Sequence, residues 1–106
     1  MKKLIAIALC ALMMLCACTA FADAKPMEGQ KVSIALSPNF MYFETVSETE
    51  ECGYEGLDID IIKSLSDKLG FEWEIIPMSF SSLVGSLQAG SVDMVISGMT
   101  YTEERD

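Results

Sequence analysis

The chain has 106 residues and a formal net charge of −9, with 16 acidic residues against 7 lysines and arginines and no histidine. This composition argues against nucleic-acid binding, because phosphate contacts need a basic surface. The four cysteines lack the spacing of a zinc site and have no histidine to complete one, so we expect neither a metal nor a cofactor.

The first residues are typical of an export signal. A basic start at Met1 precedes an unbroken apolar run over residues 4–17, the length of a signal-peptide core and short for a membrane span. The sequence around Cys18 resembles the bacterial lipobox, so we expect residues 1–17 to be a signal peptide and Cys18 to carry a lipid anchor at the outer face of the cell membrane. Cleavage after Ala22, which would leave the protein in the periplasm, and an uncleaved membrane helix are the alternatives.

Residues 18–30 are expected to form the lipid anchor and a flexible tether, because Pro26 and Gly29 interrupt a polar stretch. Residues 31–106 form the expected folded part. Alternating apolar residues predict its first strand at residues 32–36.

The segment that follows this strand is aromatic and then acidic. We predict a turn or short extended piece over residues 40–43, and a solvated acidic loop from there to Glu55. The single cysteine of this loop, Cys52, has no expected disulfide partner in the folded part.

From residue 57 the apolar residues follow a helical period, which predicts a helix that begins near Asp58 and Asp60 and ends at Gly70. An alternating strand follows at residues 71–76, stopped by Pro77.

A second helix is expected to open at Ser81 or Ser82 and to close at Gly90, and residues 93–97 predict the third strand. Strand, helix, strand, helix, strand is a βαβαβ unit, which predicts an α/β fold with a parallel sheet and right-handed crossovers. Ligands bind such sheets at the carboxyl ends of the strands.

The last strand leads into a segment with the groups needed to hold an amino acid. Gly98 exposes backbone, Thr100 supplies a hydroxyl and Arg105 supplies a planar fork of donors. Together these groups suit a carboxylate that stands beside an ammonium.

Four segments in order resemble the family 3 bacterial extracellular solute-binding proteins of polar amino-acid uptake systems. They are Gly56–Asp60, Pro77–Phe80, Gly90–Asp93 and Gly98–Arg105. The resemblance implies a periplasmic-binding-protein-like fold (type II, Venus-flytrap), of which residues 31–106 would be a partial N-terminal lobe in a fragment that lacks the second lobe. It also implies a monomeric, non-enzymatic protein that hands a free amino acid to an ABC permease.

Residue by residue, the resemblance implies that Arg105 grips the ligand α-carboxylate and that Thr100 adds a hydroxyl or amide bond. The Gly98 carbonyl would accept from the α-ammonium.

Phe40 and Phe80 would flank the ligand side chain, whereas Phe43 is expected in the core. Ser37 occupies a place that is often acidic in the family, which disfavours strongly cationic ligands, and Tyr42 stands where a proline is common. Two alternatives remain: the extracellular sensing domain of a receptor, and a periplasmic dehydratase on the same scaffold. Neither a nucleophile–base pair nor a metal set is visible in the sequence.

Overall fold

The computed structural model describes residues 1–7, 10 and 24–106. Cys18 and most of the expected signal peptide lie outside the described residues, so lipidation and cleavage stay predictions. In the described part of the chain, no helix is both long enough and apolar enough to cross a membrane.

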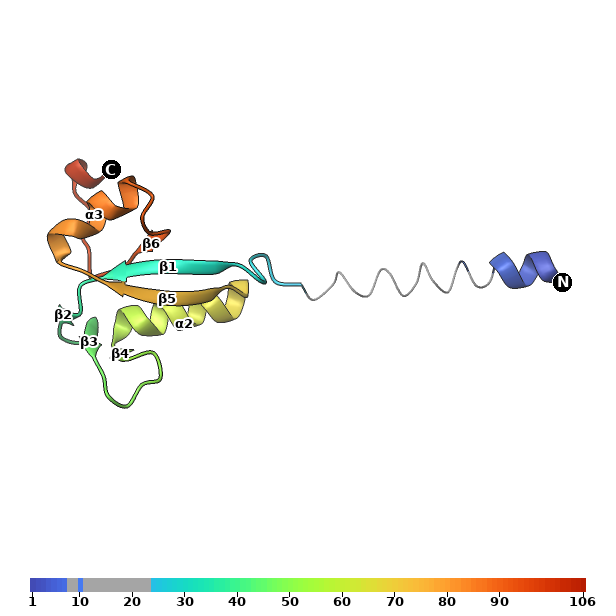
Figure 1. Ribbon diagram of the computed structural model, residues 1–106, viewed down its shortest axis with the longest axis horizontal. Helices are drawn as coiled ribbons and strands as arrows, with labels where there is room; N and C mark the ends of the chain where they lie inside the picture. Colours follow the sequence, from blue (N-terminus) through green and yellow to red (C-terminus); the bar gives the residue numbers. More distant parts are fainter. Residues whose placement is uncertain (8–9, 11–23) are drawn as a thin grey trace.

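A parallel sheet of three strands forms the centre of the lobe (Figure 1). Strand β1 (Lys31–Leu36) lies between β5 (Glu72–Pro77) and β6 (Met94–Val95), giving the order β5-β1-β6. Helix α2 (Leu57–Leu69) connects β1 to β5, and α3 (Phe80–Gln88) connects β5 to β6. The predicted βαβαβ unit is therefore confirmed.

The two helices cover opposite faces of this sheet (Figure 1), because alternate residues of β1 point to opposite sides. The larger half of the core, on the α2 side, contains Val32, Ile34, Leu36, Ile59, Ile62 and Phe71. The smaller half, on the α3 side, contains Ala35, Leu83 and Val92. Nearly continuous burial from Ile34 to Ser37 is what a parallel strand covered on both faces requires.

A second, smaller sheet stands beyond the carboxyl end of β1. It is antiparallel, with the order β2 (Asn39–Phe40), β3 (Glu44–Val46) and β4 (Tyr54–Glu55). The prediction of a loop throughout residues 44–55 was wrong at its two ends. These strands have only two or three residues each, too few for an alternating pattern to be visible in the sequence.

Asp58 and Asp60 lie in the first turn of helix α2, so they complement its start, as the sequence predicted. The N-cap of α2 is Gly56, and no side chain in the described part of the chain caps the helix. Instead, the amides of Leu57 and Asp58 donate to the carbonyls of Tyr42 and Phe43, both at 2.9 Å. The helix start is thereby fixed against the turn that carries β3. The other end follows the prediction, since Gly70 ends the helix with a φ of 86°.

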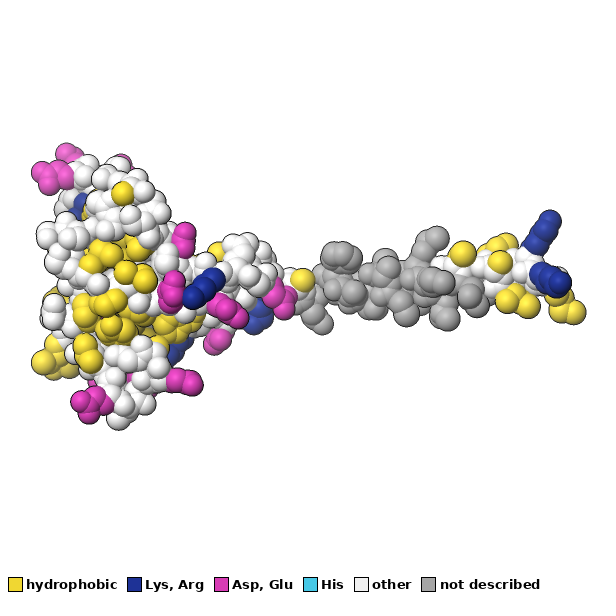
Figure 2. Space-filling model, in the orientation of Figure 1, with side chains coloured by type: hydrophobic (Ala, Val, Ile, Leu, Met, Phe, Trp, Pro, Cys, Tyr) yellow, Lys and Arg dark blue, Asp and Glu magenta, His cyan; other side chains and the backbone are white. Residues whose placement is uncertain are grey.

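The later element boundaries differ slightly from expectation. Helix α3 begins at Phe80, with Ser79 as its N-cap, one or two residues before the predicted start. Strand β6 is shorter than predicted, although Asp93 and Ile96 on either side of it still make backbone hydrogen bonds to β1. Figure 2 shows acidic side chains spread around the edge of the lobe, with hydrophobic side chains gathered in the middle of the face in view.

Candidate functional site

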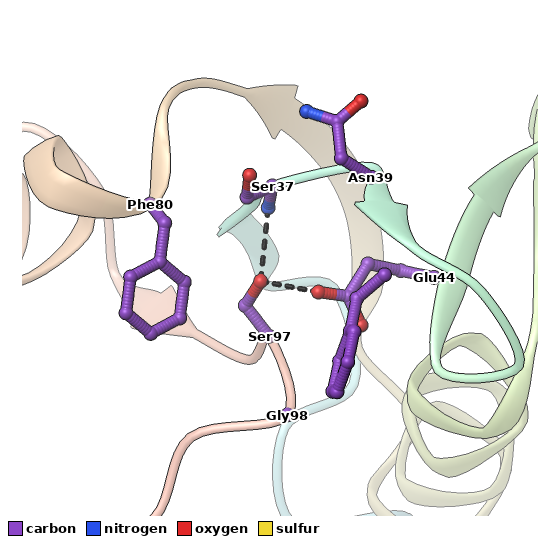
Figure 3. A pocket seen from close by; sticks show the side chains of 7 residues that line it. Ser37, Asn39, Glu44, Phe80, Ser97 and Gly98 are labelled. Carbon is purple, nitrogen blue, oxygen red and sulfur yellow. Dashed lines mark hydrogen bonds between the residues drawn. The ribbon is translucent and has the colours of Figure 1, made fainter.

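A cavity of about 310 Å³ lies beyond the carboxyl ends of β1 and β6 (Figure 3). Its lining residues are Ser37, Asn39, Phe40, Glu44, Phe80, Ser97 and Gly98. Four of the six ligand-contact residues expected from the sequence are therefore brought together at one cavity: Ser37, Phe40, Phe80 and Gly98. The position agrees with the rule that ligands bind outside the carboxyl ends of parallel strands.

Two phenylalanines wall this cavity. Phe40 is half exposed and stacks on Phe43, with ring centroids 4.7 Å apart and planes inclined by 11°. Phe43 was expected in the core, but it is only half-buried and belongs to neither half of the core described above. Phe80 stands across the cavity from Glu44 (Figure 3) and is also partly exposed.

Three polar residues on the cavity wall are joined by hydrogen bonds (Figure 3). The Ser37 amide donates to Ser97 Oγ at 3.1 Å, and the Ser97 hydroxyl donates to Glu44 Oε1. All three residues are buried. Ser97 therefore fixes the end of β1 and the start of β3 relative to each other.

Glu44 is an acid in an unfavourable place. Its side chain is fully buried, and Oε2 has no hydrogen-bond partner among the described residues. Burial raises the pKa of Glu44 to about 7; the neighbouring Asp58 carboxyl adds to the rise and the Ser97 hydroxyl opposes it. A buried carboxyl oxygen without a donor is costly, so a ligand group that reaches this oxygen and donates to it would relieve that cost.

Asp58 approaches the same wall from α2. It is 4% exposed, and its Oδ2 accepts the Gly98 amide at 2.7 Å. Asp58 thus holds the segment after β6 rather than capping its own helix.

Gly98 itself has a φ of 55°, and a Cβ there would lie 2.7 Å from Cδ1 of Phe40. Only glycine fits this close approach without moving the aromatic wall.

Thr100 and Arg105, the other two expected contact residues, do not line the cavity. Arg105 Nη1 donates to the Thr100 carbonyl at 2.9 Å, and its guanidinium carbon lies 5.5 Å from the centroid of the Phe80 ring. The guanidinium is therefore near the aromatic wall, and its expected contact with a carboxylate stays a prediction.

Sequence reasoning missed Glu44, which it counted as one of several acids in a solvated loop. The available signal was its position directly after the aromatic cluster that ends at Phe43. The neighbouring Tyr42 has a φ of 75°, which a proline, fixed near about −65°, cannot adopt. The turn before Glu44 therefore differs from one built on the proline common in the family.

Comparison with known proteins identifies the family and the fold. Residues 32–106 match the family model of the bacterial extracellular solute-binding proteins, family 3. The arginine-binding extracellular protein ArtP of Bacillus subtilis (strain 168) is 35% identical over 107 residues, covering 99% of this chain and 41% of ArtP. The crystal structure of the arginine-bound form of domain 1 from TmArgBP, of T. maritima, is 41% identical with a TM-score of 0.63, covering 71% of this chain and 58% of that one.

An enzyme also shares the scaffold: cyclohexadienyl dehydratase of Pseudomonas aeruginosa (strain PAO1) is 28% identical over 79 residues, covering 74% of this chain and 29% of the enzyme. The chain spans less than half the length of both curated relatives. The family match covers most of the chain, and the fold agrees with it. The chain belongs to the bacterial extracellular solute-binding proteins, family 3, and has the periplasmic-binding-protein-like fold in part.

Proposed function

We propose that this protein binds a free amino acid with a cationic side chain outside the cytoplasm and delivers it to an ABC-type uptake permease. The observation that carries the choice of ligand is Glu44, a buried carboxyl in a cavity walled by two phenylalanines, with one oxygen that has no partner among the described residues. A guanidinium or ammonium group supplies the missing donor and the opposite charge together. Aromatic faces favour cations as well.

The ligand's α-amino-acid group binds at the other side of the cavity in this proposal. The Gly98 carbonyl accepts from the α-ammonium, and Arg105 and Thr100 hold the α-carboxylate. The position of the Arg105 guanidinium over the ring of Phe80, which lines the cavity, supports this role.

Glu44 reverses the expectation, drawn from Ser37, that strongly cationic ligands are disfavoured. A serine at the usual acidic place disfavoured a cationic ligand, but the Ser37 amide is linked through Ser97 to another acid. Glu44 takes over the role of the absent acid. The arginine-binding proteins among the relatives support a cationic ligand.

The binding test uses isothermal titration calorimetry on the full-length protein with arginine and with citrulline, its uncharged isostere. Glu44→Gln should weaken arginine binding by at least about thirtyfold, because losing one partner of a buried charge pair costs roughly 2–5 kcal/mol. Glu48→Gln is the matched control, since Glu48 is an exposed acid of the same segment. Equal arginine affinity in the Glu44 and Glu48 variants would remove Glu44 from the site.

A second variant tests the α-carboxylate clamp. Arg105→Ala should weaken every amino acid that binds by about a hundredfold, within the same range for a broken charge pair. Near-normal binding by this variant would exclude Arg105 from the site.

Two assays separate the carrier from its alternatives. A binding protein leaves its amino acid chemically unchanged, so product formation from an aromatic amino-acid precursor would favour a dehydratase. A tethered carrier carries lipid on Cys18, so loss of labelled fatty acid in Cys18→Ala supports attachment to the membrane, whereas a continuous membrane-spanning segment would favour a receptor. We expect the protein to act as a monomer.

A further inference from the structure

The wall of the cavity contains two buried carboxyl groups that come from different elements. Glu44 begins β3 and is fully buried, and Asp58 lies in the first turn of α2 and is 4% exposed. Neither is in an ion pair: among the described residues the ion pairs join Lys31 to Glu74 and Lys63 to Glu50. Two adjacent buried carboxylates without a cation repel each other, and one of them is stabilised by taking up a proton.

The hydrogen bonds indicate where that proton resides. Asp58 Oδ2 accepts the Gly98 amide, and Glu44 Oε1 accepts the Ser97 hydroxyl. Glu44 Oε2 has no donor in the described part of the chain, so it gains most from a proton, which it can then share with Asp58.

We propose that Glu44 and Asp58 share one proton while the site is empty, that a cationic ligand side chain displaces this proton to solvent, and that Asp58 is the positioning residue that sets the pH of the exchange. This inference rests on the proposed function and deepens it. The exchange is balanced, because one positive charge enters as one proton leaves the Glu44 oxygen.

The other elements around Glu44 contribute little charge. Strand β2 brings only Asn39 and Phe40. Strand β4 brings Tyr54 and Glu55. Glu55 pairs with Thr45, whose side chain points to the face of β3 opposite to that of Glu44. The Glu55 carboxyl accepts a hydrogen bond from Ser47 Oγ at 2.9 Å.

Asp58 is therefore the charged group that faces Glu44 from α2, and Arg105 does not line the cavity. The raised pKa of Glu44, about 7 with burial as its main cause and Asp58 as the next, agrees with this arrangement.

The proposed exchange makes arginine affinity depend on pH by a measurable amount. If only the ionised form of Glu44 binds the cation, the apparent dissociation constant rises as the ionised fraction falls. With a pKa of about 7, that fraction is about one tenth at pH 6 and about nine tenths at pH 8. Arginine affinity should therefore increase about tenfold between pH 6 and pH 8.

The experiment measures arginine and citrulline binding to the full-length protein by calorimetry from pH 5.5 to 8.5. Each titration is repeated in two buffers with different ionisation enthalpies, which reports the number of protons released. Arginine should release close to one proton at pH 6 and close to none at pH 8. Citrulline has the same α-groups but no side-chain charge, so its affinity should stay nearly constant.

Two variants test the assigned roles. Glu44→Gln should abolish both the pH dependence and the proton release. Asp58→Asn retains an oxygen that can accept the Gly98 amide but removes the negative charge, so the midpoint of the pH dependence should shift to lower pH. A merely structural role for Asp58 would change affinity at every pH without moving the midpoint.

The outcomes separate this inference from the proposed function. Arginine binding that is tight but independent of pH and buffer would overturn the shared proton and leave the proposed function standing. An unmoved midpoint in Asp58→Asn would overturn the role assigned to Asp58 and would also leave the function standing. Failure of all twenty amino acids to bind at any pH would overturn both. A carbon-13 NMR titration of the Glu44 carboxyl in the ligand-free protein gives an independent check: a midpoint near pH 7 supports the pair, and one near pH 4 overturns it.

Discussion

Replacing Gly98 by alanine should damage the cavity in a way that can be separated from backbone strain. Gly98 has a φ of 55°, and an added Cβ would lie 2.7 Å and 2.8 Å from two ring atoms of Phe40. Because the clash is with the far part of a half-exposed side chain, the ring can swing away. It then leaves its stacked position on Phe43 and moves one wall of the cavity.

The chain offers a matched control in Gly90. This residue has a similar left-handed conformation, with a φ of 72°, but a Cβ there meets no atom of the described residues within 4 Å. Both substitutions cost about 1–2 kcal/mol of stability for a non-glycine residue in this conformation. Gly98→Ala also loses the Phe40–Phe43 stacking, worth about 0.5–1.5 kcal/mol. The difference between the two variants therefore isolates the contact with the ring.

Denaturant unfolding and calorimetric ligand binding on the full-length protein measure the two effects. Gly98→Ala should be less stable than Gly90→Ala by about 0.5–1.5 kcal/mol. It should also bind its amino acid more weakly, whereas Gly90→Ala should bind normally. Indistinguishable stability and affinity in the two variants would refute the argument that Gly98 is required by the approach of Phe40.

Three further predictions follow from other contacts. Gly56→Ala should be destabilised more than Gly53→Ala in denaturant unfolding. A Cβ at Gly56 would lie 2.3 Å from a main-chain oxygen that cannot move aside, whereas a Cβ at Gly53 would meet no atom of the described residues within 4 Å. Ser97→Ala should cost about 2–4 kcal/mol in the same assay, since it leaves two buried groups unpaired, and the NMR titration of Glu44 should show a still higher pKa. Hydrogen bonds from the Ser33 amide and hydroxyl lower the pKa of Asp93. The ionised Asp93 carboxylate therefore stabilises the folded state above about pH 4, and this contribution is lost as the pH falls through the pKa of the folded state. Unfolding measured down to pH 3 should therefore show a smaller acid-induced loss of stability in Asp93→Asn than in the unmodified chain.

The large elements of the fold could be predicted from the sequence because their signals are long. Helix α2 has thirteen residues, an apolar face and a glycine at its end, and β1 alternates before entering a fully buried stretch. Their order alone implied the parallel sheet. Phe40, Phe80 and Gly98 could be assigned to one cavity for the same reason, since each follows the carboxyl end of a predicted strand.

The antiparallel sheet could not be predicted, and with it the position of Glu44 was lost. Its strands are too short for a periodic signal, and they are held in place by contacts distant in the sequence. The turn before β3 is fixed by amides of α2, and Glu44 is buried by Ser97, which lies 53 residues further along the chain. The period of a short segment does not report such contacts, so Glu44 was counted with the acids of the loop, although its position directly after the aromatic cluster distinguished it from them.

The segment just after β6 is where the separate parts of the site become one unit. Ser97 binds the amide of Ser37 and the carboxyl of Glu44, and the next residue, Gly98, donates to Asp58 and packs against Phe40. Two adjacent residues therefore fix the end of β1, the start of β3 and the first turn of α2. A ligand that contacts Gly98 and Glu44 needs little further ordering of these segments, which lowers the entropic cost of binding. The same contacts link the charge of Glu44 to Gly98, the residue expected to hold the ligand's α-ammonium. Recognition of the ligand's side chain and recognition of its α-ammonium therefore cannot be independent in this site.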